Sequence, residues 1–223
     1  MYLFIIRHAE SEKNTRNGFS SEEDLEPLTE KGKNDSVEIA NYIADFVKNK
    51  SLTSKKIYTA GSVRSKETAE EIASKLNSEV CIEQALRSIK SGKLMGKSEK
   101  EAENSHPEYM QEYYLFRKGV FNSYDFNAPE DKEPKKDFEQ RVISCINKII
   151  SDESESIKII VAHRASITTA LLEFAKKYHN YPTVFSGHIL LDLGFVSVLK
   201  KEKNDTWKIL KVNEKINNII NDL

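Results

Sequence analysis

The sequence predicts an α/β fold in which a mostly parallel sheet carries helices on both faces. Short apolar runs rich in β-branched residues alternate along the chain with longer segments whose apolar residues recur every three or four positions. The chain has 223 residues, which is enough to bury a sizeable core without metal or disulfide staples. Strands that alternate with helices of this length are joined by right-handed crossovers, and such crossovers make neighbouring strands parallel.

Five apolar segments with turn residues beside them are predicted to be strands. They are residues 2–6, 56–59, 79–82, 157–162 and 189–199. Near the end of the sequence, residues 195–199 and 206–212 flank a polar turn at 203–205. This pattern predicts an antiparallel pair of strands at one end of the sheet.

Three segments between the strands carry apolar residues at helical spacing. These residues are Val37, Ala40, Ala44 and Val47; Ala69, Ile72, Ala73 and Leu76; and Val142, Cys145, Ile146 and Ile149. Each set lies on one side of a helix. We therefore expect three amphipathic helices.

Residues 91–136 fit the alternation poorly. Ser98 and Glu101 have the spacing of a capping box, which begins a short helix, and His106-Pro107 ends it. A second helix follows with an aromatic stripe made of Tyr109, Tyr113 and Phe116. The simplest expectation for this stripe is packing against the sheet.

The whole chain, residues 1–223, is interpreted as a single domain. Within it, residues 91–136 form a helical and loop excursion, and residues 122–136 have a loop-like composition with two prolines. An insertion of this size in an α/β sheet is more often a lid or pocket wall than a separate domain. We expect it to lie over the active site.

The composition excludes several classes of protein. The 34 Lys and Arg residues balance 35 Asp and Glu residues, and no long block of one sign occurs, so no nucleic-acid-binding surface is predicted. No stretch resembles a signal peptide or approaches the ~20 apolar residues of a membrane span. Cys81 and Cys145 are far apart, which favours inert thiols in a reducing compartment. We expect a cytoplasmic protein with no membrane partner; its oligomeric state is open.

Cationic side chains follow three of the predicted strands. Arg7 and His8 end the first strand, Arg64 comes after the second, and His163 follows residues 157–162. Ligands of open α/β sheets bind outside the carboxyl ends of the strands. A buried cationic cluster is costly unless it faces an anion, and arginine fits phosphate with two hydrogen bonds. The sequence therefore predicts a phosphate site at this edge.

Five short motifs occur in order along the chain. They are Arg7-His8-Ala9-Glu10-Ser11-Glu12-Lys13-Asn14, Pro27-Leu28-Thr29-Glu30-Lys31-Gly32, Ser62-Val63-Arg64-Ser65-Lys66-Glu67-Thr68-Ala69, the Glu and Arg of segment 133–142, and Val161-Ala162-His163. Together they resemble the signature of the histidine phosphatase, or phosphoglycerate mutase-like, superfamily, with Ala9 where that family usually has glycine. The resemblance runs from Met1 to about Asn213.

The resemblance implies a metal-independent phosphatase that acts on a small phosphomonoester through a phosphohistidine on His8. Arg7, Arg64 and His163 would hold the phosphoryl oxygens during the reaction. The implied substrate-binding residues are Asn14, Ser20 and Ala165. No metal or cofactor is expected, since the sequence has neither an HExxH motif nor a GxxxxGK[ST] loop.

One position departs from the family pattern. The family usually has a glutamate here as the general acid that protonates the leaving oxygen, and this chain has Ser88. A serine hydroxyl is far too weak an acid to replace a carboxyl group near neutral pH. Either Glu133, Asp137 or Glu83 supplies the acid, or the substrate needs little acid help.

Two other functions stay open. Some family members that lack the glutamate act on phosphohistidine in proteins, where imidazole leaves more readily than an alkoxide, so a protein phosphohistidine phosphatase is one alternative. The other is a non-catalytic phosphate-binding regulatory protein. The long excursion favours a small phosphate ester, and the lack of a tryptophan-rich segment around Leu86 favours a phosphatase over a mutase.

Overall fold

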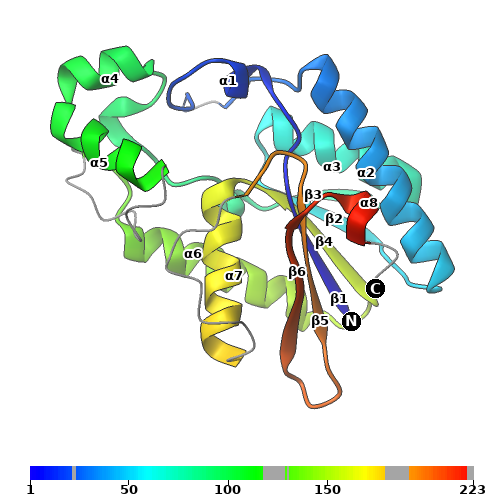
Figure 1. The fold of residues 1–223 in the computed structure, drawn as a ribbon. Coiled ribbons are helices and arrows are strands. Elements are labelled where there is room, and N and C mark those ends of the chain that lie inside the picture. Colours follow the sequence, from blue (N-terminus) through cyan, green and yellow to red (C-terminus); the bar gives the residue numbers. More distant parts are fainter. Residues whose placement is uncertain (22–23, 118–128, 130, 179–190, 220–223) are drawn as a thin grey trace.

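One six-stranded sheet forms the centre of the computed structural model, which describes residues 1–21, 24–117, 129, 131–178 and 191–219. The strand order is β3-β2-β4-β1-β5-β6 (Figure 1). The strands are β1 (Tyr2–Arg7), β2 (Lys56–Thr59), β3 (Glu79–Ile82), β4 (Ile157–Ala162), β5 (Val196–Lys201) and β6 (Trp207–Glu214). The first four strands are parallel and the last two pair antiparallel, as the sequence predicts.

Helices cover both faces of this sheet. They are α1 (Glu12–Thr15), α2 (Glu30–Asn49), α3 (Val63–Leu76), α4 (Glu99–Ser105), α5 (Pro107–Arg117), α6 (Lys135–Ser151), α7 (Arg164–Tyr178) and α8 (Ile216–Ile219), with 3-10 turns at Gln84–Leu86 and Gly92–Leu94. Helices α2 and α3 lie on one face, and α6 and α7 on the other (Figure 1). The predicted fold class is confirmed.

Strand β1 contributes alternate side chains to the hydrophobic cores on both faces of the sheet. Leu3 and Ile5 pack toward α6 and α7, whereas Phe4 and Ile6 pack toward α2 and α3, and all four side chains are buried. A strand covered on both sides reads as an unbroken apolar run rather than an alternating one. No helix in the described part of the chain is both long and apolar enough to cross a bilayer.

The helix predicted around residues 37–47 forms as α2, but its buried face differs from the expected one. Val37 is exposed, and the buried apolar side chains of α2 are Ile39, Ala40, Ile43 and Phe46. Both sets of residues have helical spacing. The set with the larger side chains faces the sheet because it removes more apolar area from water.

The strand predicted over residues 189–199 is wrong over residues 191–195. Strand β5 begins at Val196, and residues 189–190 lie outside the described part. Residues 191–195 form a loop instead, with Gly194 at a φ of 75°. The Gly194 N–H lies 3.1 Å from the carbonyl oxygen of Arg7 and 3.2 Å from that of His8. The loop therefore contacts the chain directly at the end of β1.

Within the excursion, α4 and α5 form a helical pair beyond the carboxyl edge of the sheet (Figure 1). The capping box of Ser98 and Glu101 is confirmed at the start of α4. The expected packing of the aromatic stripe against the sheet is wrong. Tyr109 and Tyr113 pack instead around Phe19, at ring-centroid distances of 6.2 and 5.3 Å. The side chain of Phe116 lies outside the described residues.

Candidate active site

The carboxyl ends of β1 and β4 bring two histidines side by side. The parallel register pairs Arg7 with Ala162, and the His8 N–H donates to the Ala162 carbonyl at 3.1 Å. His8 and His163 are therefore the next residues of adjacent strands. Their rings lie 5.1 Å apart, centroid to centroid, and both side chains are buried.

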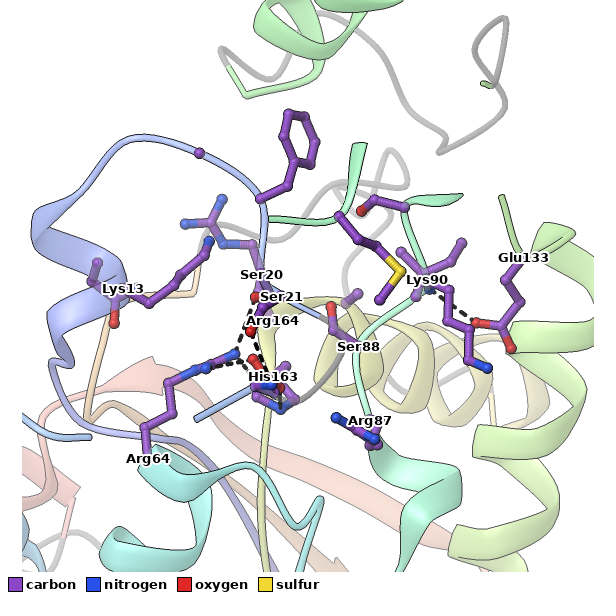
Figure 2. A pocket seen from close by; sticks show the side chains of 18 of the residues that line it. Lys13, Ser20, Ser21, Arg64, Arg87, Ser88, Lys90, Glu133, His163 and Arg164 are labelled. Carbon is purple, nitrogen blue, oxygen red and sulfur yellow. Dashed lines mark hydrogen bonds and ion pairs between the residues drawn. The ribbon is translucent and has the colours of Figure 1, made fainter. Parts of the chain in front are cut away.

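Helix α3 adds Arg64 to this pair. The Ser62 side chain caps the helix by accepting from the Ser65 N–H, which places Arg64 in the first turn at the same sheet edge. The buried Arg64 guanidinium donates from Nε to His8 Nε2 at 3.2 Å. Its Nη2 lies 3.5 Å from Nδ1 of His163, a contact drawn in Figure 2.

The hydrogen bonds of His8 fix which ring nitrogen has a lone pair. Nδ1 lies 2.8 Å from the Ala9 carbonyl oxygen, which can only accept, so Nδ1 carries the proton. Nε2 is then the unprotonated nitrogen, and it accepts from Arg64. A neutral imidazole with Nε2 facing a cationic pocket has the form that can attack an electrophilic phosphorus atom.

The pKa values of both histidines are held low, so both rings are neutral near pH 7. Burial, followed by the charges of His163, Arg64 and Arg7, holds the pKa of His8 well below 6.5. Burial and the neighbouring arginines do the same to the pKa of His163. The arginines therefore carry the positive charge at this edge, and His163, which was expected to share it, is a neutral group.

A cavity of about 730 Å³ opens over these side chains. Its lining includes every site residue that the sequence predicts: Arg7, His8, Asn14, Ser20, Arg64, Ser88, His163 and Ala165. Ala165 lies in the first turn of the 15-residue helix α7, whose first N–H groups have no partner within the helix. A helix N-terminus of this kind favours a bound anion.

Asn14 and Ser20, two of the predicted substrate-binding residues, are each held by hydrogen bonds. The Asn14 carbonyl oxygen accepts from the Ser11 backbone N–H at 3.0 Å and from the Ser11 hydroxyl at 2.6 Å. Its amide nitrogen therefore points away from Ser11. The Ser20 hydroxyl oxygen accepts from Arg64 Nη2 at 3.3 Å (Figure 2).

The lining is more cationic than the sequence reasoning expected. The additional basic residues are Lys13, Arg16, Arg87, Lys90, Lys132, Arg141 and Arg164. Burial and the charges of Arg64 and Arg7 lower the pKa of Lys13 to about 8. Lys13 lies inside the first motif at a position that carries no family role. Arg141 is the Arg of the motif in segment 133–142, but the other members come from separate elements, and no local pattern predicts that they gather around one cavity.

The loop that carries Ser88 is held firmly in place. Arg141 donates from Nη1 to the carbonyl oxygens of Ala85, at 2.6 Å, and Arg87, at 3.0 Å, and from Nη2 to that of Ser88 at 3.1 Å. Ser166 adds a bond from its hydroxyl to the Leu86 carbonyl at 2.7 Å. The loop thus keeps a fixed course beside the cavity, although position 88 offers only a hydroxyl group.

The three carboxylates expected as replacement acids do not occupy that position. Glu133 lines the cavity, but Arg141 holds it at 2.6 and 2.8 Å (Figure 2 shows Glu133 beside Lys90). Burial would raise the pKa of Glu133, but hydrogen bonds from Arg141 and the Lys90 backbone outweigh it and lower the pKa. Asp137 is exposed, and Glu83 pairs with Lys148 at 3.6 Å; neither lines the cavity.

A different carboxylate, which the sequence reasoning missed, lies within the site. Asp24 is buried, and its Oδ1 lies 2.6 Å from Arg64 Nη1. Its Oδ2 lies 3.8 Å from Nε2 of His163. Glu26 lies slightly farther out, with Oε2 3.7 Å from Arg64 Nη1. Asp24 comes from the segment between two motifs, and only folding brings it to Arg64.

The described residues contain no group of three or more His, Cys, Asp or Glu side chains that could hold a metal ion. Both cysteines are free, and burial raises their thiol pKa values, that of Cys145 to about 11. This agrees with the prediction that they are inert thiols.

Comparisons with known proteins agree on one family and one fold. The model of the histidine phosphatase superfamily (branch 1) matches residues 3–215. No curated protein matches the sequence significantly.

Several solved structures share the fold. YhfR of Bacillus stearothermophilus has a TM-score of 0.75 and 21% identity, covering 96% of this chain and 98% of that one. The alpha-ribazole phosphatase of Shigella flexneri has a TM-score of 0.72 and 19% identity, covering 96% and 97%. A mycobacterial glucosyl-3-phosphoglycerate phosphatase has a TM-score of 0.74 and 15% identity, covering 96% and 99%.

Proposed function

The chain belongs to the histidine phosphatase superfamily, and on that basis we propose that it hydrolyses small phosphomonoesters without a metal, through a phosphohistidine formed on His8. The observation that carries the proposal is the buried contact of Arg64 with Nε2 of His8, at 3.2 Å, in the floor of the cavity. In this contact the unprotonated nitrogen of His8 lies beside a guanidinium, a group that can bind phosphoryl oxygens through two hydrogen bonds.

In the proposed reaction, His8 Nε2 attacks phosphorus while the bond to the leaving oxygen breaks in line with it. Arg7 and Arg64 bind the non-bridging oxygens, with N–H groups at the start of α7 as further donors. Water then attacks the phosphohistidine and releases inorganic phosphate. Preorganised charge of this kind is usually the largest contribution to phosphoryl transfer.

His163 gains its role when the anion arrives. Its pKa is low in the empty site because of burial and the neighbouring arginines. A phosphate dianion supplies the opposite charge and so favours the protonated ring. We therefore propose that binding takes up a proton at His163, which then donates to a phosphoryl oxygen.

The walls of the cavity favour a small substrate over a protein. Phe19, Tyr109 and Tyr113 line its outer part, and the position of the α4–α5 pair at the sheet edge supports a lid role for this part of the 91–136 excursion (Figure 1). Ligand pockets of small molecules typically have volumes of about 300–1,000 Å³. A cavity of about 730 Å³ with aromatic walls suits a phosphorylated metabolite. The two free cysteines support a cytoplasmic setting for it.

A panel of phosphorylated metabolites, nitrophenyl phosphate and a phosphohistidine peptide tests the proposal. We expect turnover of small esters that survives EDTA and is inhibited competitively by vanadate and inorganic phosphate. Activity on the phosphohistidine peptide alone would favour the protein phosphatase instead. Complete loss with EDTA, restored by a divalent metal, would refute a metal-independent mechanism. Binding of phosphate without turnover of any compound would favour the regulatory protein.

A further inference from the structure

We propose that Asp24 is the general acid that protonates the leaving oxygen, in the role for which position 88 has no carboxyl group. This inference rests on the proposed phosphatase function. It concerns a residue outside the motifs that carry the family resemblance. Its support is the placement, charge and burial of Asp24 relative to His8, Arg64 and His163.

Elimination among the carboxylates points to Asp24. The described residues that line the cavity include three with a carboxyl group, Asp24, Glu99 and Glu133. Glu133 pairs with Arg141, whose other hydrogen bonds go to the loop of Ser88 and not to the histidines. Glu99 lies in the excursion with Oε2 3.4 Å from the Tyr114 hydroxyl. Asp24 is the member of this set that contacts the catalytic cluster, through Arg64 at 2.6 Å.

The Arg64 guanidinium forms hydrogen bonds to both Asp24 and the proposed nucleophile, His8. Its Nε donates to His8 Nε2, and its Nη1, on the opposite side of the planar group, donates to Asp24 Oδ1. A phosphoryl group bound along Arg64 therefore has His8 at one end and Asp24 at the other. In-line displacement requires the nucleophile and the leaving oxygen to be on opposite sides of phosphorus.

Charge explains how Asp24 comes to hold a proton. Its carboxylate is buried against Arg64 Nη1, a donor that a phosphoryl oxygen would also bind. When a dianion enters, two like charges meet in a buried pocket, and one of them must become protonated or move away. A protonated Asp24 keeps its place and turns from a competitor for Arg64 into a donor to the ester oxygen.

Every bond and proton is accounted for in the two half-reactions. In the first, the His8 Nε2 lone pair forms the N–P bond, the bond from phosphorus to the ester oxygen breaks, and the Asp24 proton passes to that oxygen to give the alcohol. In the second, Asp24 as carboxylate accepts a proton from water while the water oxygen bonds to phosphorus. The N–P bond then breaks, and its electron pair returns to Nε2.

Substituted phenyl phosphates of graded leaving-group acidity provide the test, because they share one shape and thus the same contacts with the aromatic wall. We expect a shallow dependence of kcat/KM on leaving-group pKa in the wild type. In Asp24→Asn the dependence becomes steep. Nitrophenyl phosphate loses less than about 10-fold, and unsubstituted phenyl phosphate loses about 10²–10⁴-fold, the usual worth of general acid catalysis.

Two further variants separate acid catalysis from a change of charge. Glu26→Gln removes the neighbouring carboxylate, whose Oε2 is 3.7 Å from Arg64, and should leave the dependence on leaving group unchanged. Asp24→Asn combined with Ser88→Glu returns a carboxyl group to the loop held by Arg141. This double variant should recover a shallow dependence.

The outcomes distinguish the two levels of the proposal. If Asp24→Asn slows all the phenyl phosphates by the same factor, Asp24 positions Arg64 and is not the acid. A steepened dependence in Glu133→Gln, with none in Asp24→Asn, would assign the acid to Glu133. Failure of the wild type to turn over any of these esters would instead overturn the phosphatase function itself.

Discussion

The two ends of the cavity are built in different ways. The phosphate end, made of His8, Arg64 and His163, is placed by strand ends and a helix cap and is buried. The outer end, made of Phe19, Tyr109 and Tyr113, comes from a loop and the excursion, and its residues are held by ring packing. Backbone register fixes the first; side-chain contacts of a small cluster fix the second.

This difference separates chemistry from specificity. A donor in the phosphate end contacts the charge that develops in the reaction, so its removal should lower kcat strongly. In the proposed function, we expect a ring in the outer end to contact the organic part of the substrate equally before and during the reaction. Its removal should act mainly on KM. Substitutions at each end test whether the effects on kcat and on KM separate between the phosphate end and the outer end of the cavity.

The largest effect is expected for the nucleophile. His8→Ala should lower kcat by about 10⁴-fold or more, by comparison with other catalytic nucleophiles. Trapped wild-type enzyme should carry phosphate that is lost in acid and kept in base, because phosphohistidine is a phosphoramidate. His106→Ala, at the C-cap of α4 and outside the cavity lining, serves as the control and should keep both activity and label. Label that survives acid, or that remains on His8→Ala, would mean that another residue is the nucleophile.

The next effect concerns the guanidinium of the phosphate end. Arg64→Ala should lower kcat/KM by about 10²–10³-fold, the range found when one preorganised donor is lost. Arg16→Ala is a matched control, since Arg16 lines the same cavity but is exposed and bonds to the Glu12 carbonyl. Steady-state kinetics with nitrophenyl phosphate compares them. Equal losses in the two variants would contradict a special role for Arg64.

A smaller, pH-dependent effect is expected for Lys13, between the two ends. Burial, with Arg64 and Arg7, lowers its pKa to about 8, so the ammonium is charged below that pH and loses its charge above it. Lys13→Met should therefore raise KM about 10-fold at pH 6.5 and progressively less above pH 8, given the usual worth of a hydrogen bond to a charged group. The ratio of wild-type to variant KM across pH is the measurement, because substrate ionisation cancels in it. A ratio that does not change with pH would show that Lys13 acts through packing.

The pKa of His8 adds a second pH signature. In the proposed reaction its neutral form attacks phosphorus, and burial and nearby positive charge hold the pKa well below 6.5. The acid limb of kcat/KM in the free enzyme should therefore lie below pH 6.5, not at it. A titration of the His8 ring by NMR gives the same quantity directly. A midpoint at or above 6.5 would contradict the proposed electrostatics of the phosphate end.

The smallest effect is expected at the outer end. Tyr113→Ala should raise KM by roughly 3–10-fold for a bulky phosphate ester, with kcat nearly unchanged, as for the loss of an apolar contact. Inorganic phosphate, which has no organic part, should inhibit the variant as well as the wild type. A large fall in kcat would mean that the excursion shapes the phosphate end after all.

The sequence alone determined the parts of this protein that depend on local pattern. The residues that follow the strands 2–6 and 157–162 could be read as one cluster because parallel strands end at one edge. The chain's own motifs located Arg64 and the empty acid position at Ser88. The prediction for the buried face of α2 is wrong, because helical spacing alone does not say which of two apolar faces has the larger side chains and is buried.

Tertiary structure decided what no local pattern encodes. Asp24 meets Arg64 across 40 positions of sequence, and the aromatic residues of α5 meet Phe19 instead of the sheet. Such contacts depend on the course of loops, which follow from packing and not from periodicity. Charge works in the same way: the sequence is balanced at −1 overall, and only folding gathers many of its basic side chains around one cavity, together with a smaller number of carboxylates such as Asp24 and Glu133. Long-range electrostatics depends on distances in space, and a sequence fixes those only through its fold.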